Sequence, residues 1–179
     1  MSTLTERLIG AARLDNRIYE ELEADVGGTA QAMMVVVASS IAGGVGAAGL
    51  GGFSATSLVT GTVAALIGWG AWAVLTYVIG TKMLPEPGTR ADIGELLRTT
   101  GFASAPGLIR VAGLVPGLAS LVLLVAALWM LAAMIVAVRQ ALDYKSTGRA
   151  VLVCFVGWLV SIAIAVLIGL FTPPLQSGG

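Results

Sequence analysis

Asp92 and Glu95 are an acidic pair whose spacing could serve acid–base catalysis or hold a metal ion. Carboxylates three residues apart on a helix lie on one face, which such chemistry requires. The chain has no histidine, the commonest general base and metal ligand, and its single cysteine, Cys154, lies in an apolar stretch. We therefore interpret the pair as solvated loop charge. We expect no catalytic residues, no cofactor, no metal ligands and no enzyme activity.

Arg110 is the other residue that could do chemistry, because it is the one charge in the apolar stretch 99–115. A cation at the centre of a membrane-spanning helix costs about 2.5–3.5 kcal/mol on insertion scales, so such a residue usually has a function. Arg110 also lies near the Pro116 end of its stretch, from which a long side chain can reach lipid headgroups. Both interpretations stay open: a functional charge on an anion path, or a lipid-contacting one. Pro106 should bend the same stretch and free a backbone carbonyl.

Four longer stretches contain no Asp, Glu, Lys or Arg: residues 30–49, 58–81, 118–138 and 150–171. About 20 helical residues cross the roughly 30 Å core of a bilayer, so each stretch is long enough to span it. The chain is 57% hydrophobic and 11% charged, with a mean hydropathy of +0.94. Its formal net charge is zero, which gives no attraction to nucleic acid. The sequence predicts an integral membrane protein in contact with membrane lipids and not with nucleic acid.

The shorter stretch 99–115 is counted as a fifth span because of the charges around it. Short loops rich in Lys and Arg stay on the cytoplasmic side of a membrane. Basic residues gather in 82–98 and again in 139–149. Two crossings between these segments, by 99–115 and 118–138, leave both on that side. We predict an all-α, integral membrane five-helix bundle.

This topology divides the chain into three parts. Residues 1–29 form a cytoplasmic amphipathic segment, residues 30–171 form the membrane domain, and residues 172–179 form an extracytoplasmic tail. The N-terminus is then cytoplasmic and the C-terminus extracytoplasmic, in the cell membrane.

The N-terminal segment is predicted to form two short helices with a bend near Asp15. Thr3 and Glu6 have the spacing of a capping box, and Asp15 can cap the second helix. An apolar stripe follows helical spacing at Leu4, Leu8, Ala11, Ala12, Ile18 and Leu22. The segment either lies on the inner headgroups or docks a cytoplasmic partner.

Small residues at four-residue spacing predict where helices approach closely, since lipid provides no hydrophobic force between helices. The helix-packing residues predicted on this basis are Gly44, Ala48, Gly157, Ser161, Ala165 and Gly169. They serve either packing within one chain or a homo-oligomer.

Short motifs along most of the chain resemble the Yip family of Ypt/Rab-interacting proteins, as a prokaryotic member. They are ARLD at 12–15, YEELEAD at 19–25, LLR at 96–98, GFASAP at 101–106, VP at 115–116 and STGRA at 146–150. The resemblance implies five spans and a cytoplasmic N-terminus. Eukaryotic members bind lipid-modified small GTPases, but bacteria lack the Rab machinery, so that activity is not carried over.

Together these features predict a non-enzymatic scaffold or adaptor that organises membrane-protein partners. The alternative is a small transporter or channel subunit for a small solute or anion, with Arg110 on its path. A lipid-handling protein is a third class that the residues leave open.

Overall fold

The described part of the chain is entirely helical. The computed structural model describes residues 2–50 and 54–171, with side chains except at 165 and 168–171. Within these residues lie seven α-helices and no strand. Four segments are long and apolar enough to cross a membrane: Val26–Leu50, Ala55–Met83, Ala119–Ala141 and Thr147–Ile164. The predicted all-α membrane class is confirmed, whereas the count of five bundle helices is not exact.

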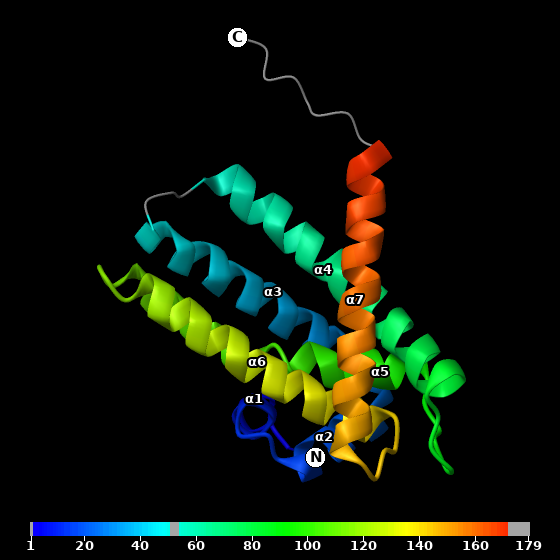
Figure 1. The fold of residues 1–179 in the computed structure, drawn as a ribbon. Coiled ribbons are helices and arrows are strands. Elements are labelled where there is room, and N and C mark those ends of the chain that lie inside the picture. The colour runs from blue at the N-terminus through cyan, green and yellow to red at the C-terminus, as the bar shows by residue number, and fades with distance from the viewer. Residues whose placement is uncertain (1, 51–53, 172–179) are drawn as a thin grey trace.

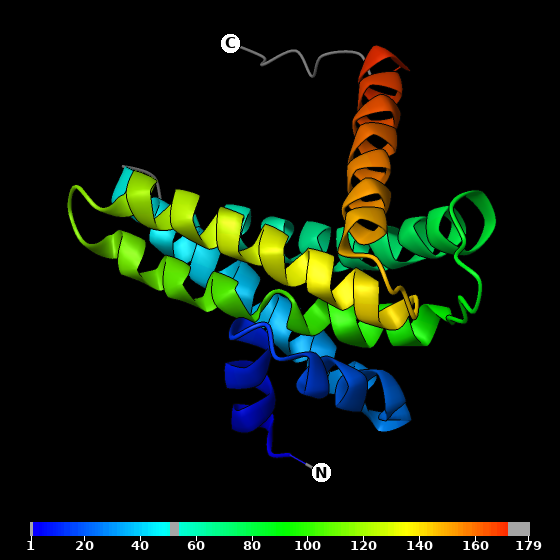
Figure 2. The same ribbon diagram turned by 60° about the horizontal axis from the view of Figure 1, so that its bottom comes forward.

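Three long helices lie side by side: α3 (Thr29–Ala47), α4 (Ala55–Val78) and α6 (Ala119–Ala141) (Figure 1). The stretch formed by α5 (Ile93–Phe102) and η4 (Ala105–Leu114) runs along α6, as Figure 2 shows. Helix α7 (Thr147–Phe171) packs on α6 and α4 with its first turns and then leaves this layer (Figures 1 and 2).

The stretch 99–115, expected to be one bent helix, is not a continuous α-helix. Helix α5 ends at Phe102, and a 3₁₀ helix, η4, begins at Ala105. Pro106 causes the break, since it has no N–H to donate and its ring clashes with a continuing α-helix. A 3₁₀ helix rises about 2.0 Å per residue against 1.5 Å for an α-helix. Ten α-helical and ten 3₁₀ residues therefore extend about 35 Å, enough to run the length of the bundle.

Contacts with α3 show that α5 and η4 do run its whole length. A Cβ on Gly101 would lie 2.7 Å from Ala32 Cβ, near the start of α3. At the other end, a Cβ on Gly49 would overlap the Gly113 carbonyl oxygen. Between them, a Cβ on Gly46 would overlap the Arg110 carbonyl oxygen. The two backbones touch, and glycine is required where they do.

The predicted helix-packing residues have mixed positions. Gly44 faces α4, where its Cβ would lie 2.5 Å from Leu58 Cδ1, and Gly157 faces α4 at Trp72. The Ser161 hydroxyl donates to the Gly157 carbonyl of its own helix at 2.8 Å. Ala48 belongs to the short 3₁₀ turn η2 (Ala48–Leu50) that follows α3. The side chain of Ala165 and the packing of Gly169 lie outside the described residues.

In the N-terminal segment, helix α1 (Leu4–Ala12) begins with the Thr3–Glu6 capping box, and Asp15 caps α2 (Asn16–Ala24). The two predicted helices and both caps are confirmed. The α1–α2 corner reaches the middle of α6, where the Trp129 Nε1 donates to the Ala12 carbonyl at 2.7 Å. Helix α2 lies at the end of the bundle where α5 begins and α6 ends. The same end carries the α4–α5 loop, 84–92, and the α6–α7 loop, 142–146 (Figure 1). We call this end the charged end, because every charged residue except Arg110 lies in 1–25, 82–98 or 139–149.

Candidate functional site

Arg110 is partly buried and is anchored to the middle of α3. Its Nη2 donates to the Ser39 carbonyl oxygen at 2.6 Å and to the Ser39 hydroxyl at 2.8 Å. Its Nε donates to the Gly107 carbonyl at 3.0 Å, one turn back along η4. Ser39 is near the centre of the candidate span Val26–Leu50. The side chain therefore turns back into the bundle instead of extending toward Pro116.

Two glycines make room for the guanidinium. A Cβ on Gly43 would lie 2.8 Å from Arg110 Nη1, and one on Gly107 would lie 3.0 Å from Nη2 and overlap the Ser39 hydroxyl. Gly107 directly follows Pro106, so the break in the third stretch also shapes the space around the charge. A helix continuing through this point would place its backbone elsewhere. Pro106 thus acts on Arg110 through the backbone.

Within residues 2–50 and 54–171, no carboxylate pairs with the Arg110 charge. All acidic residues of the sequence lie in 1–25, 86–95 or at position 143, at the charged end. The described ion pairs involve Arg7, Arg17 and Arg149. Carbonyl and hydroxyl dipoles are therefore the groups that stabilise the guanidinium. They leave a full positive charge in an apolar domain, which favours an anion nearby.

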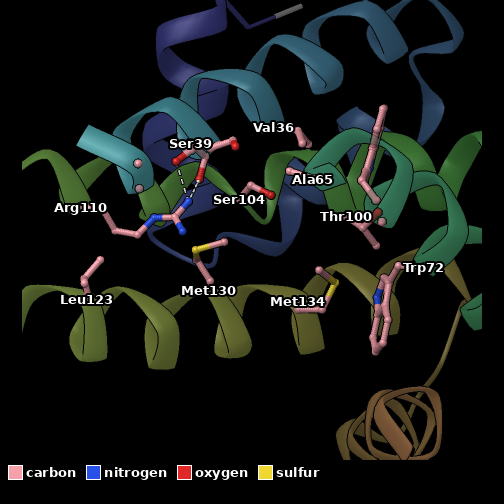
Figure 3. Close-up of a pocket in the computed structure, with 15 residues that line it drawn as sticks. Val36, Ser39, Ala65, Trp72, Thr100, Ser104, Arg110, Leu123, Met130 and Met134 are labelled. Atoms are coloured by element: carbon pink, nitrogen blue, oxygen red, sulfur yellow. Dashed lines mark hydrogen bonds between the residues drawn. The ribbon is translucent and has the colours of Figure 1, made fainter. Parts of the chain in front are cut away.

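A cavity of about 480 Å³ adjoins Arg110. It is lined from α3, α4, α5, η4 and α6 and is open on one side. Figure 3 shows Arg110 and Ser39 at one end of the cavity and Trp72 at the other, with Met130 and Met134 along α6 between them. The cavity carries a cation at one end, and over the rest of its length it is mainly apolar with a few polar groups.

Two further donors in the lining are not used by the protein itself. The Trp72 Nε1 is buried and has no hydrogen-bond partner within the described residues. The Ser104 hydroxyl, which does not cap η4, bonds to no other described residue. An unpaired donor that is buried, as the Trp72 Nε1 is, costs about 1–3 kcal/mol, so its retention calls for an explanation; Ser104 is only partly buried. Both donors, like Arg110, suit a ligand that accepts hydrogen bonds.

A second cluster joins the N-terminal segment to the bundle through Arg98. This side chain is 5% exposed. Its Nε donates to the Leu22 carbonyl at 3.1 Å and its Nη2 donates to the Glu23 carbonyl. These carbonyls belong to the last turn of α2, where helix carbonyls lack partners and a cation is favourable. Arg98 therefore serves as the C-terminal cap of α2 and does not face water.

Arg7 is the other buried cation at the charged end, with 2% exposure. Its guanidinium pairs with Glu21 at 2.9 Å and with Asp25 at 2.7 Å, and it donates to Gln31 Oε1 at 3.0 Å. These contacts tie α1 to α2 and to the start of α3. Tyr19 and Leu22 are buried beside Phe102 in the same core. Most of the apolar stripe of the segment thus packs into the bundle, whereas Leu4 is exposed.

The acidic pair Asp92 and Glu95 is a capping box for α5. Asp92 Oδ1 accepts from the Glu95 N–H at 2.8 Å, and Glu95 Oε2 accepts from the Asp92 N–H at 2.7 Å. This reciprocal arrangement satisfies two backbone donors at the helix start. The three-residue spacing of Asp92 and Glu95, which resembles that of a catalytic pair, is the spacing that this capping box requires.

The loops of the charged end are also fixed to one another. The last turns of α4 widen into a π-helix, Ile79–Met83, and the Tyr144 hydroxyl lies 2.9 Å from the Gly80 carbonyl oxygen and 2.7 Å from that of Leu84. Glu86 accepts from the Lys145 N–H at 3.0 Å and pairs with Arg149 at 3.5 Å. The 84–92 and 142–146 loops therefore form one surface.

Comparison with known proteins identifies a family whose model matches this chain. A model described as the Yip1 domain matches residues 16–168, which covers α2 through most of α7. No curated protein and no solved structure matches the chain.

Proposed function

Because this chain belongs to the Yip1 domain family, a family of multi-pass membrane proteins, we propose that it is a non-enzymatic scaffold or adaptor of the cell membrane. In this proposal the charged end is cytoplasmic, the C-terminus is extracytoplasmic, and α5 with η4 completes a fifth crossing. Partners are other membrane proteins or a second copy of the chain.

The observation that carries the proposal is the construction of the charged end. There Arg98 joins the N-terminal segment to α5, Tyr144 joins the 142–146 loop to the 84–92 loop, and Arg7 ties α1 to α2. A surface assembled in this way is rigid before a partner arrives, which lowers the entropic cost of binding. It also holds nearly all the charges of the chain, which select partners by electrostatic complementarity.

Site-specific photocrosslinking in living cells tests this proposal. The crosslinker replaces Arg17, whose side chain is 87% exposed at the charged end, or Leu118, which is exposed at the other end of the bundle. We expect the crosslinker at position 17 to form adducts with a reproducible set of membrane proteins, and the crosslinker at position 118 to form none with them. The adducts should also form when the crosslinker is placed in the partner protein instead. Adducts to lipid alone from both positions would contradict a scaffold.

The second candidate is a small transporter or channel subunit for a small solute or anion, which the Arg110 cavity favours. Flux through the protein reconstituted in vesicles should then fall in Arg110→Ala. Equal flux for wild type, Arg110→Ala and empty vesicles would reject this candidate.

A further inference from the structure

We propose that the Arg110 cavity is a binding site for an anionic phosphate group, held by Arg110 and Ser104. This inference is independent of the scaffold role. It rests on a cation that pairs with no carboxylate in the part of the chain that the structure describes, on the donors around it and on the cavity beside it.

The hydrogen-bond donors that line the cavity indicate that its ligand is an anion. Arg110 spends Nε and Nη2 on the carbonyls of Gly107 and Ser39 and on the Ser39 hydroxyl. Its Nη1 makes no hydrogen bond to another described residue and packs against Gly43, which lines the cavity together with Arg110. The Ser104 hydroxyl lies in the same lining, on the Arg110 side of Thr100 in Figure 3. Phosphate offers several acceptor oxygens to such a set and neutralises the charge.

The anchoring of Arg110 favours binding over passage. The guanidinium donates hydrogen bonds to two backbone carbonyls and one hydroxyl of the protein. Its position is therefore fixed before a ligand arrives. The guanidinium packs closely against Gly43 and Gly107, where a larger side chain would displace it. A fixed cation in an apolar domain binds an anion more strongly than one exposed to water.

Two sources supply the same chemistry. The phosphate can be the headgroup of an anionic lipid, whose chains would lie along Met130, Met134 and Trp72. It can also be free inorganic phosphate that enters the open side of the cavity. The buried Trp72 Nε1 stands at the apolar end and is available to a ligand that fills the full length.

The test uses the full-length protein in nanodiscs of phosphatidylcholine, with or without phosphatidylglycerol. Native mass spectrometry counts retained lipid, and equilibrium dialysis with inorganic phosphate in pure phosphatidylcholine nanodiscs measures free anion binding. The variants are Arg110→Gln and Ser104→Ala, with Arg90→Gln, an exposed loop cation, as the matched control. Loss of a charge-assisted hydrogen bond should weaken binding about tenfold or more in Arg110→Gln, and less in Ser104→Ala.

Each outcome decides the matter. Preferential retention of phosphatidylglycerol that depends on Arg110 and Ser104 supports the site with a lipid source. Phosphate binding with the same dependence supports it with a free source. If Arg110→Gln fails to fold, Ser104→Ala alone decides. Retention of neither probe by the wild type, or binding that both folded variants and Arg90→Gln share equally, overturns the proposal.

Discussion

Arg110 Nη2 lies 2.6 Å from the carbonyl oxygen of Ser39, a residue 71 positions earlier in the chain. This bond joins η4 to the middle of α3 and places a cation where the nearest sequence neighbours are apolar. The hydroxyl of the same serine accepts from the same nitrogen at 2.8 Å. One residue of α3 therefore provides two of the three acceptors that fix Arg110.

Ser39→Ala should destabilise the bundle while keeping the carbonyl contact. Loss of one hydroxyl acceptor for a buried cation should lower the free energy of unfolding by about 1–2 kcal/mol. Unfolding in mixed micelles, followed by tryptophan fluorescence, measures the change. Ser40→Ala is the control, since its hydroxyl bonds to Thr62 at 3.3 Å and not to Arg110. An equal loss of unfolding free energy in both variants would show that the Ser39–Arg110 hydrogen bond does not contribute more to stability than the Ser40–Thr62 bond.

Gly46→Ala should be far more harmful than an alanine elsewhere in these helices. The added Cβ would overlap the Arg110 carbonyl oxygen, so α3 and η4 would have to separate. We expect a loss of about 3 kcal/mol or more in the free energy of unfolding. The control is Gly61→Ala, where nothing lies within 4 Å of the new Cβ. That variant should be neutral or gain up to about 1 kcal/mol. Similar stabilities for the two would refute direct backbone contact.

Arg98→Gln should release the N-terminal segment while leaving the membrane helices folded. The carbonyls of Leu22 and Glu23 would lose their cationic donor, at a cost of about 1.5–3 kcal/mol for each bond lost. Hydrogen exchange read by mass spectrometry should rise in residues 2–25 and stay unchanged in α6. Arg90→Gln, at an exposed position in the adjoining loop, should leave the pattern as it is in the wild type. Protection that survives Arg98→Gln would mean that Arg98 does not hold α2.

The same segment should respond to pH through Glu23. Burial, with Asp143, Glu95 and Glu20 nearby, raises the pKa of Glu23 to about 7 from an ordinary 4.5, while Arg98 opposes the shift. The folded state then keeps the Glu23 proton between pH 4.5 and 7 while the unfolded segment loses it, so stability falls as pH rises through that window. Hydrogen exchange in residues 2–25 should increase from pH 5 to pH 7 after correction for intrinsic rates. Glu23→Gln should remove this dependence, and a slope that persists in the variant would exclude Glu23 as its cause.

Glu21 should act in the opposite direction and at lower pH. Arg7 and Ser2 hold its pKa at about 2, below its ordinary 4.5. Its stabilising effect is therefore present above pH 4.5 and is lost as pH falls toward 2. In Glu21→Gln the acid-induced loosening of α1 from α2 should disappear, as measured by the same exchange. Unchanged acid sensitivity would place the titrating group elsewhere.

Local patterns predicted much of this fold, because they depend on neighbouring residues. Apolar length located the long helices, and the Thr3–Glu6 and Asp15 signals located two helix starts. The break at Pro106 was expected only as a bend, since sequence does not show that a ten-residue 3₁₀ helix would follow.

Long-range partners were missed for a physical reason. Hydropathy treats every cation as solvated, so it hid Arg98, whose partners are carbonyls 75 and 76 residues away. Arg7 had a detectable signal: it lies three residues after Leu4 and four before Ala11, on the apolar face of its helix. Four-residue spacing selected Gly44, whereas the backbone contact with η4 uses Gly46 and Gly49. Which face of a small-residue helix meets a partner depends on the partner.

Topology mapping tests the central claim, that the three segments holding every charge except Arg110 lie on the cytoplasmic side of the membrane. Compartment-specific reporters are fused before residue 1, within each of the 84–92 and 142–146 loops, and after residue 179. We predict a cytoplasmic signal from the first three positions and an extracytoplasmic signal from the last. Both chain ends in one compartment, or the two loops in different ones, would contradict the account.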